Sequence, residues 1–334
     1  MSFMRTLLPI LAAGLVLSLV IWPQIAKRRD FISDVLKSSS VPLNSKAQID
    51  MKRVLFYSED KKGQPFILTA DKIWEIDTED KTIRIDAPKG EMTLNSGIKL
   101  VSESPFALYN QEKGIVHFDE QVHLTSDNGY NIEASSIFVD YQNQKAESKK
   151  PILVRGEKID LDAVGFNMRQ NGNEVDFKGP VKVVLKDQEK KQQITITGKK
   201  VMEVRQKTQT ITFYEDVFAD YGENKISCAK MTAYFKSVGK NSYDLKSVQA
   251  QKGVKITTLN EVITGDDAFY DLEKERAFIT GKVTIKRAEG TMSGSRAVVD
   301  MKTGLSQLEA DTKKKTNNRV KGTIYTDKIK RTER

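Results

Sequence analysis

The sequence contains a single cysteine and only two histidines among its 334 residues. One cysteine excludes an internal disulfide framework, and the position of Cys228 in an alternating apolar pattern predicts a small core residue. His117 and His123 enclose Asp119 and Glu120, but no cysteine is nearby, whereas zinc sites use a compact set of four ligands. The sequence therefore predicts neither a metal site nor a cofactor.

Catalytic motifs are missing as well. The serines lack a basic partner in any recognisable nucleophile motif. The neighbouring carboxylates Asp266 and Asp267 follow Gly265, and small residues occupy the same position in other repeats of the chain. We interpret this group as a structural corner and expect that the protein is not an enzyme.

Positive charge is concentrated at one end of the chain. The chain has 54 Lys and Arg against 45 Asp and Glu, a net charge of +9. Residues 311–334 hold nine of these cations and three of the acids, so the other 310 residues carry only +3. A nearly balanced body does not predict nucleic acid as a partner. The basic tail is interpreted as a solvated spacer, with contact to ligand phosphates as the alternative.

One long uncharged run is present, at residues 6–26. It is long enough to cross a hydrocarbon layer of about 30 Å as a helix, and Trp22 and the basic residues 27–29 follow where the membrane interface would lie. No small-x-small cleavage site follows, so a retained anchor is favoured over a signal peptide. The anchor residues are Leu7, Leu11, Leu15, Leu19 and Trp22. Counted alone, the basic residues after the run would place the body in the cytoplasm.

Strand-like alternation fills most of the remaining chain. In GYNIEASSIFVDYQNQ, residues 129–144, apolar and polar residues alternate and the phase shifts by one at small residues. Such alternation predicts a strand with one face on a core, and the phase shift predicts a bulge or corner. Similar units place small residues at Ala70, Ala134, Ala163, Gly198, Ala229, Gly265 and Gly294.

A second recurring element is a strand with a central bend. The bends fall at Val122, Ile152, Val181, Val217, Val254 and Val283, at intervals of 30, 29, 36, 37 and 29 residues. Two strands and their turns fill such an interval, which leaves no room for a long helix. The sequence therefore predicts an all-β protein in which two bent sheets face each other, built by repetition.

These patterns divide the chain into five parts. We expect an N-terminal transmembrane anchor at residues 1–29, a polar tether at 30–50, a first array at 51–189, a second array at 190–310, and a basic tail at 311–334 in which VKGTIYTDK adds a possible edge strand. The charged stretch KDQEKKQQ, residues 186–193, is interpreted as the seam between the arrays.

Five segments between Leu7 and Leu185 together carry a resemblance to a known family: LLPILAAGLVLSLVIWP, PFILTADKIWEID, RIDAPKGEMTL, VHLTSDNGYNIEASSIFVDYQNQKAESKKPILVRG and GFNMRQNGNEVDFKGPVKVVL. With them, this part of the chain resembles the LptC family of membrane-anchored lipopolysaccharide transport proteins. The second array, with VITGDDAFYDLEKERAFITGKVTIKRAEGTMSGSRAVVDMKTG, resembles the periplasmic bridge protein LptA and OstA-type domains. The resemblance implies two consecutive β-jellyroll modules in one chain.

The same resemblance implies a function and partners. It implies that the chain accepts lipopolysaccharide from an inner-membrane ABC transporter, beside LptF/LptG-like permease subunits, and passes it toward the outer membrane. It also implies strand-edge pairing with further LptA-like modules or an LptD-like translocon, and a body in the periplasm, against the charge count after the anchor. The alternative is a membrane-tethered scaffold or adhesin-like spacer with a closed core that binds no lipid.

Alternation selects the residues that point inward and are candidates for contact with acyl chains. In the first array these are Phe66, Leu68, Val116, Phe118, Val122, Leu124, Ile132, Ile137, Val139, Phe177, Val181 and Val183. In the second they are Ile194, Ile196, Ile211, Phe213, Ile256, Phe278, Val283 and Ile285. For each of them, plain core packing is the competing interpretation.

Overall fold

A computed structural model describes residues 50–59, 65–77, 81–93, 99–110, 112–127, 129–140, 143, 145–170, 173–187, 192–239, 242–300, 303, 306–310 and 320–324. Thr6–Ala26, the expected anchor, and most of the expected tether and basic tail lie outside these residues. The strands of the described part pair antiparallel, and the predicted all-β class is confirmed.

The chain divides into two units, which meet in sequence at Lys178 and Gly179. The strands of the N-terminal unit are β1 (Asp50–Glu59), β2 (Pro65–Asp77), β3 (Thr82–Asp86), β4 (Lys89–Thr93), β5 (Lys99–Glu103), β6 (Phe106–Asn110), β7 (Ile115–Ser126), β8 (Asn131–Asp140), β9 (Lys145–Ser148), β10 (Ile152–Arg155), β11 (Ile159–Ala163), β12 (Gly165–Arg169) and β13 (Glu174–Lys178).

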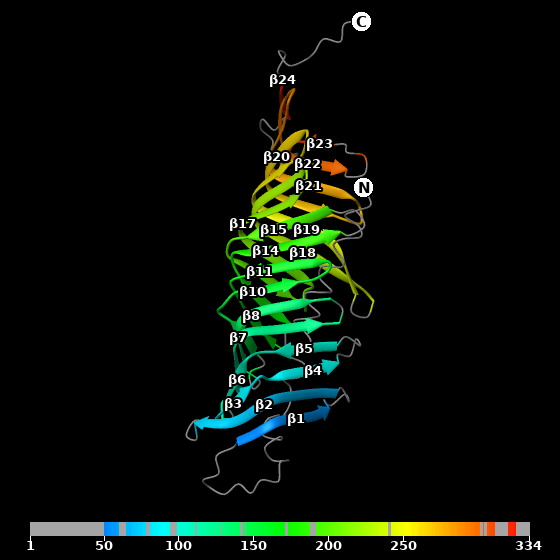
Figure 1. Cartoon of the computed structure of the whole chain (residues 1–334). Coiled ribbons are helices and arrows are strands. Elements are labelled where there is room, and N and C mark those ends of the chain that lie inside the picture. Colours follow the sequence, from blue (N-terminus) through cyan, green and yellow to red (C-terminus); the bar gives the residue numbers. More distant parts are fainter. Residues whose placement is uncertain are drawn as a thin grey trace. The chain divides into compact units, whose positions relative to one another are not determined.

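The strands of the C-terminal unit are longer on average (Figure 1). They are β14 (Val181–Asp187), β15 (Gln192–Gly198), β16 (Val201–Arg205), β17 (Thr210–Tyr221), β18 (Asn224–Gly239), β19 (Ser242–Thr257), β20 (Glu261–Asp271), β21 (Arg276–Arg287), β22 (Gly290–Asp300), β23 (Ser306–Glu309) and β24 (Lys321–Ile324). The last of these, β24, is the edge strand expected in VKGTIYTDK.

Each unit consists of two walls that the same strands pass through in turn. The first half of β7 pairs with β6 and with the second half of β8, whereas its second half pairs with β5 and the first half of β8. The strands β17 to β22 divide in the same way around a register shift. We call the wall that contains the second half of β7 or β17 wall A, and the other wall B, separately in each unit.

The bends between the walls share one backbone conformation. Two successive residues with positive φ precede the bend valine in β7 (Glu120 and Gln121) and in β17 (Glu215 and Asp216). In β19 and β21 a glycine supplies one of the two, at Gly253 and Gly281, where positive φ costs least. The inserted pair turns the strand from one wall into the other, as a β-bulge does.

Small residues lie opposite the bends. Val122 pairs with Ala134, Val254 with Gly265 and Val283 with Gly294. Val217 pairs with Cys228, so the expected corner at Ala229 is wrong by one residue. The facing residue must be small because the walls converge there: a Cβ on Gly265 would come within 2.6 Å of Ile279 Cγ2. We call this line of corners the seam.

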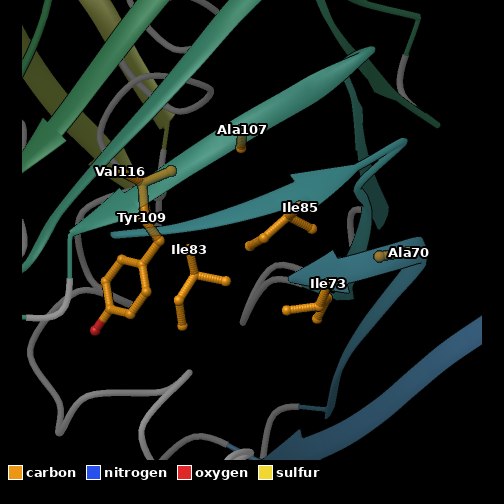
Figure 2. Packing of buried hydrophobic residues seen from close by; sticks show 7 residues of the cluster. All are labelled: Ala70, Ile73, Ile83, Ile85, Ala107, Tyr109 and Val116. Carbon is orange, nitrogen blue, oxygen red and sulfur yellow. The ribbon is translucent and has the colours of Figure 1, made fainter. Parts of the chain in front are cut away.

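The core of the N-terminal unit begins on wall B. Ala70, Ile73, Ile83, Ile85, Ala107, Tyr109 and Val116 form one buried cluster from β2, β3, β6 and β7 (Figure 2). Full burial of such an aliphatic side chain contributes about 1.5–3 kcal/mol.

Among the described connections, strands cross between the walls only at the seam, and the hairpin turns at the other ends of the strands stay within one wall. We call that side the mouth.

Candidate functional site

The inner face of wall A in the C-terminal unit carries one continuous apolar row. Strand register places its members side by side across six neighbouring pairs of strands. The members of this isoleucine row are Ile196, Ala219, Ile226, Ile256, Ile263, Ile285 and Met292. Ile263 and Ile285 are buried, but Ile196, Ile226, Ile256 and Met292 are only half-buried.

The inner face of wall B in the same unit carries both small and large residues. Each strand from β18 to β22 has an alanine there: Ala233, Ala250, Ala268, Ala277 and Ala297. These alanines alternate along their strands with larger residues such as Met231, Val248 and Ile279. Ala268 and Ala277 pack against the cluster that includes Ile263, Ile279, Val283 and Ile285. A methyl group fills less of the space between two sheets than a larger side chain does, and the sheets of a sandwich lie about 10 Å apart. We therefore expect that the alanines leave part of the isoleucine row uncovered.

The inner face of wall A in the N-terminal unit is different. There the row contains Leu68, Gly90, Ser102, Leu124, Ile132, Val154 and Leu161. Exposure falls along it, from half-buried Leu68 and Leu124 to 1% at Val154 and 0% at Leu161. Large side chains such as Phe166 and Phe177 are buried on the facing strands β12 and β13. This end of the unit has a tightly packed interior.

Some of the residues predicted to point inward are fully buried, and others are only half-buried on an inner face. The buried ones are Val116, Val122, Ile132, Ile137, Val139, Phe177, Val181, Val183, Ile194, Ile211, Phe213, Val283 and Ile285. Leu68, Phe118, Leu124, Ile196 and Ile256 are half-buried on inner faces, and Phe66 lies in β2 opposite Met92. Contact of any of them with an acyl chain stays a prediction.

The prediction that the Phe278 side chain points inward is wrong. It alternates with Ala277 and Ile279, which belong to the core cluster. Its neighbour across the strand pair, Phe269, is 38% exposed, and the guanidinium of Arg296 lies 5.1 Å from the centre of the Phe278 ring. Phe278 therefore lies on the outer face of wall B.

Sequence reasoning missed several residues of the row and one ion pair beside it. The predicted set lacks Ile226, Ile263 and Met292, although Ile226 and Met292 alternate with polar residues. Arg287 donates hydrogen bonds to Glu261, and both residues lie in register with the inner-facing residues of β20 and β21. Only strand register reveals this pair, because 26 residues separate its members.

Polar groups in the described residues do not form a catalytic arrangement. His117 Nε2 lies 2.9 Å from Ser136 Oγ, and Asp119 Oδ1 lies 4.0 Å from the same nitrogen. In a catalytic triad the carboxylate binds the other ring nitrogen. The His117 ring stacks on Phe138, and the corner at Glu120 and Gln121 separates it from His123. The described residues contain no group of three or more His, Cys, Asp or Glu that would hold a metal.

Cys228 is a structural residue of the seam. Its side chain is buried, and its Sγ donates to the carbonyl oxygen of Lys230. Burial raises the pKa of the thiol to about 11. A thiol with that pKa is almost fully protonated at neutral pH and is a poor nucleophile.

Comparison with known proteins gives the family. The family model described as lipopolysaccharide-assembly, LptC-related, matches residues 10–186, more than half of the chain. The chain belongs to the LptC-related family. A second model, for the LptA/LptD N-terminal domain of lipopolysaccharide transport proteins, matches residues 195–305. The predicted combination of an LptC-like and an LptA-like part is thus confirmed.

The other comparisons add little to the family models. The solved structure of LptH, titled the LptA homologous periplasmic component of the lipopolysaccharide transport device of Pseudomonas aeruginosa, matches with a TM-score of 0.34 and 15% identity, over 40% of this chain and 94% of that chain. The search of curated proteins finds no match.

Membership of these families defines the function at a coarse level. The chain has a non-enzymatic role in lipopolysaccharide transport through a periplasmic bridge. The LptC family faces the periplasm and is anchored in the inner membrane. Within the described residues, no helix has the length and apolar character needed to span a bilayer.

Proposed function

We propose that this chain accepts lipopolysaccharide from an inner-membrane ABC transporter and passes it along the apolar inner faces of its two units toward the outer membrane. The observation that carries the proposal is the isoleucine row, an apolar row on an inner face whose members Ile226, Ile256 and Met292 are only half-buried. Each methylene buried against such a row contributes about 0.8 kcal/mol, so several acyl chains would be held firmly.

The proposal includes a single-pass anchor in the inner membrane, formed by Leu7, Leu11, Leu15, Leu19 and Trp22. The body, with domains at residues 51–189 and 190–310, then lies in the periplasm. A reporter fused after Arg334 tests this orientation, because a reporter active only in the periplasm supports it and one active only in the cytoplasm contradicts it.

The partners follow from the two ends of the chain. The anchor would lie beside LptF/LptG-like permease subunits. The edge strands β1 and β24 present backbone groups that accept a further strand, which suits pairing with LptA-like modules or an LptD-like translocon. Because the two parts share one chain, their association is intramolecular and has a high effective concentration.

The tightly packed interior around Leu161 and Val154 favours the second candidate, a scaffold with a closed core that binds no lipid. Mass spectrometry of lipid bound to the purified full chain separates the two. Lipopolysaccharide in the spectrum supports transport, and a lipid-free chain from cells that make lipopolysaccharide supports the scaffold.

Photocrosslinking then locates the lipid. A crosslinking residue at Ile256 should capture lipopolysaccharide, and one at exposed Phe269, on the outer face, should not. Ile196→Asp or Phe118→Asp should reduce capture at neighbouring positions without loss of the β-sheet spectrum. Equal capture at Ile256 and Phe269 would exclude the inner face as the path.

A further inference from the structure

The ion pair between Glu261 and Arg287 continues the inner face of wall A toward the mouth. On β20 and β21, Ile263 pairs with Ile285, and Glu261 pairs with Arg287 two residues further along. Two residues of a strand span roughly 7 Å. A charged pair therefore follows directly on the isoleucine row, on the same side of the sheet.

The geometry of the pair leaves the cation accessible. Arg287 Nε and Nη2 each lie 2.7 Å from Glu261 Oε2. The Glu261 side chain is 14% exposed, but that of Arg287 is 41% exposed. On the other side of Arg287, β22 contributes Gly290 and therefore no side chain. The guanidinium has an open side and can meet another anion.

The turn that precedes β20 lies beside the ion pair. Hydrogen bonds fix its backbone, and it carries an exposed apolar side chain. Thr258 accepts a hydrogen bond from the backbone nitrogen of Glu261 and donates one to its carbonyl oxygen, which fixes the turn before β20. In that turn Leu259 is 72% exposed. The mouth beside Arg287 thus combines one cation with an exposed apolar side chain, the two features that the junction between a lipid headgroup and its acyl chains requires.

Arg287 has no equivalent among the described residues of β14 to β24. The remaining lysines and arginines of these strands alternate with the inner-facing residues or lie at corners and register shifts. Lys286, for example, pairs with Val262 and Thr291 on the outer face, and Arg276 pairs with Asp300 across wall B. Within this part of the chain, an anion held against the isoleucine row would meet Arg287 alone.

We propose that Arg287 binds a phosphate group on the headgroup of the transported lipid, with Glu261 as its partner in the empty state. This inference rests on the proposed function and adds a polar contact to it. A guanidinium binds phosphate through two parallel hydrogen bonds, and such charge-assisted bonds are strong. Exchange of partners leaves the Glu261 carboxylate, which is 14% exposed, without its cation, so Glu261 opposes phosphate binding and the phosphate must form the stronger contact with Arg287.

The test measures binding of two probes to the full chain in detergent: lipopolysaccharide with its lipid A phosphates, and the same preparation after enzymatic removal of those phosphates. Arg287→Met should weaken binding of the phosphorylated probe about tenfold and leave binding of the other unchanged. Glu261→Gln should tighten binding of the phosphorylated probe. Arg276→Met removes the same charge from the outer face of wall B and should change neither value.

Different failures have different meanings. If Arg287→Met weakens both probes equally, or if the unchanged protein does not distinguish them, Arg287 is not a phosphate contact although lipid transport stands. If the unchanged protein binds neither probe, the proposed function fails and the inference with it. Arg287→Lys keeps the charge but loses the bidentate geometry. This variant should therefore retain part of the preference for the phosphorylated probe over the dephosphorylated one. An unchanged circular dichroism spectrum verifies that each variant is folded.

Discussion

The interiors of the two units differ although the same alternation builds both. On β11 of the N-terminal unit, Ile159 and Leu161 have no exposed surface, whereas Ile256 and Met292 in the C-terminal unit are only half-buried. The facing walls differ as well: Phe166 and Phe177 are buried on one, whereas on the other alanines alternate with larger residues. Alternation determines which face is inside, and the sizes of the facing residues determine whether that inside is closed.

This comparison bears on transport. Under the proposed function, a lipid in the C-terminal unit would contact side chains that are already partly exposed. In the N-terminal unit near β10 and β11, the same lipid would have to displace packed side chains. Protein interiors are packed as densely as organic crystals, so that displacement requires the walls to separate.

The largest expected effect is on stability in the closed interior. Leu161→Ala removes a side chain with no exposed surface and should lower the free energy of unfolding by about 3 kcal/mol. Ile256→Ala removes a half-buried side chain and should lower the free energy of unfolding by about 1 kcal/mol. Urea unfolding followed by circular dichroism measures both. Equal decreases in the free energy of unfolding would mean that the two interiors are packed alike, which would contradict the difference described above.

An intermediate effect is expected at the seam, where the C-terminal unit is closed as well. A Cβ on Gly294 would lie 2.8 Å from Leu308 Cγ and 2.9 Å from the carbonyl oxygen of Glu309. Gly294→Val should therefore lower the free energy of unfolding by about 2 kcal/mol, because the backbone oxygen cannot move aside. Gly322 has no atom near its Cβ position, so Gly322→Ala is the matched control and should be nearly neutral. A neutral Gly294→Val would show that the openness extends to the seam.

Much of this architecture follows from the sequence. The recurring valines and small residues predict where the strands bend and turn a corner. That they meet across one strand pair, as Val122 does with Ala134 and Val283 with Gly294, appears only once the strands are paired. The prediction from alternation places Phe278 inward, but the phase relative to Val283 places Ala277 and Ile279 inside. Phase is the better guide on a strand, since neighbouring side chains point to opposite faces.

The candidate site was less predictable because it depends on residues distant in sequence. Whether Ile256 is exposed depends on alanines of the other wall, and the partner of Arg287 depends on the register of β20 with β21. A single chain gives neither before the strands are paired. The sequence identified several members of the isoleucine row, such as Ile196 and Ile285, but not the feature that distinguishes the row, which is its open surface.

The smallest expected effect on stability tests whether the open surface matters. Ala277 is half-buried and packs against the core cluster beside half-buried Val299. Ala277→Leu should fill open space, so the free energy of unfolding should change by less than about 1 kcal/mol. The added side chain would occupy space that an acyl chain needs, so photocrosslinking of lipopolysaccharide at Ile256 should fall several-fold.

Ala297 is the matched control for that change, because it is an alanine of the same wall with 0% exposure. Ala297→Leu overpacks a closed position and should destabilise the C-terminal unit by about 1–3 kcal/mol. If Ala277→Leu destabilises as much as Ala297→Leu, no open space exists beside Ala277. If it is neutral and crosslinking at Ile256 is unchanged, the space exists but lipid does not use it. Only a neutral substitution that also lowers crosslinking connects the alanines of wall B to the passage of lipid.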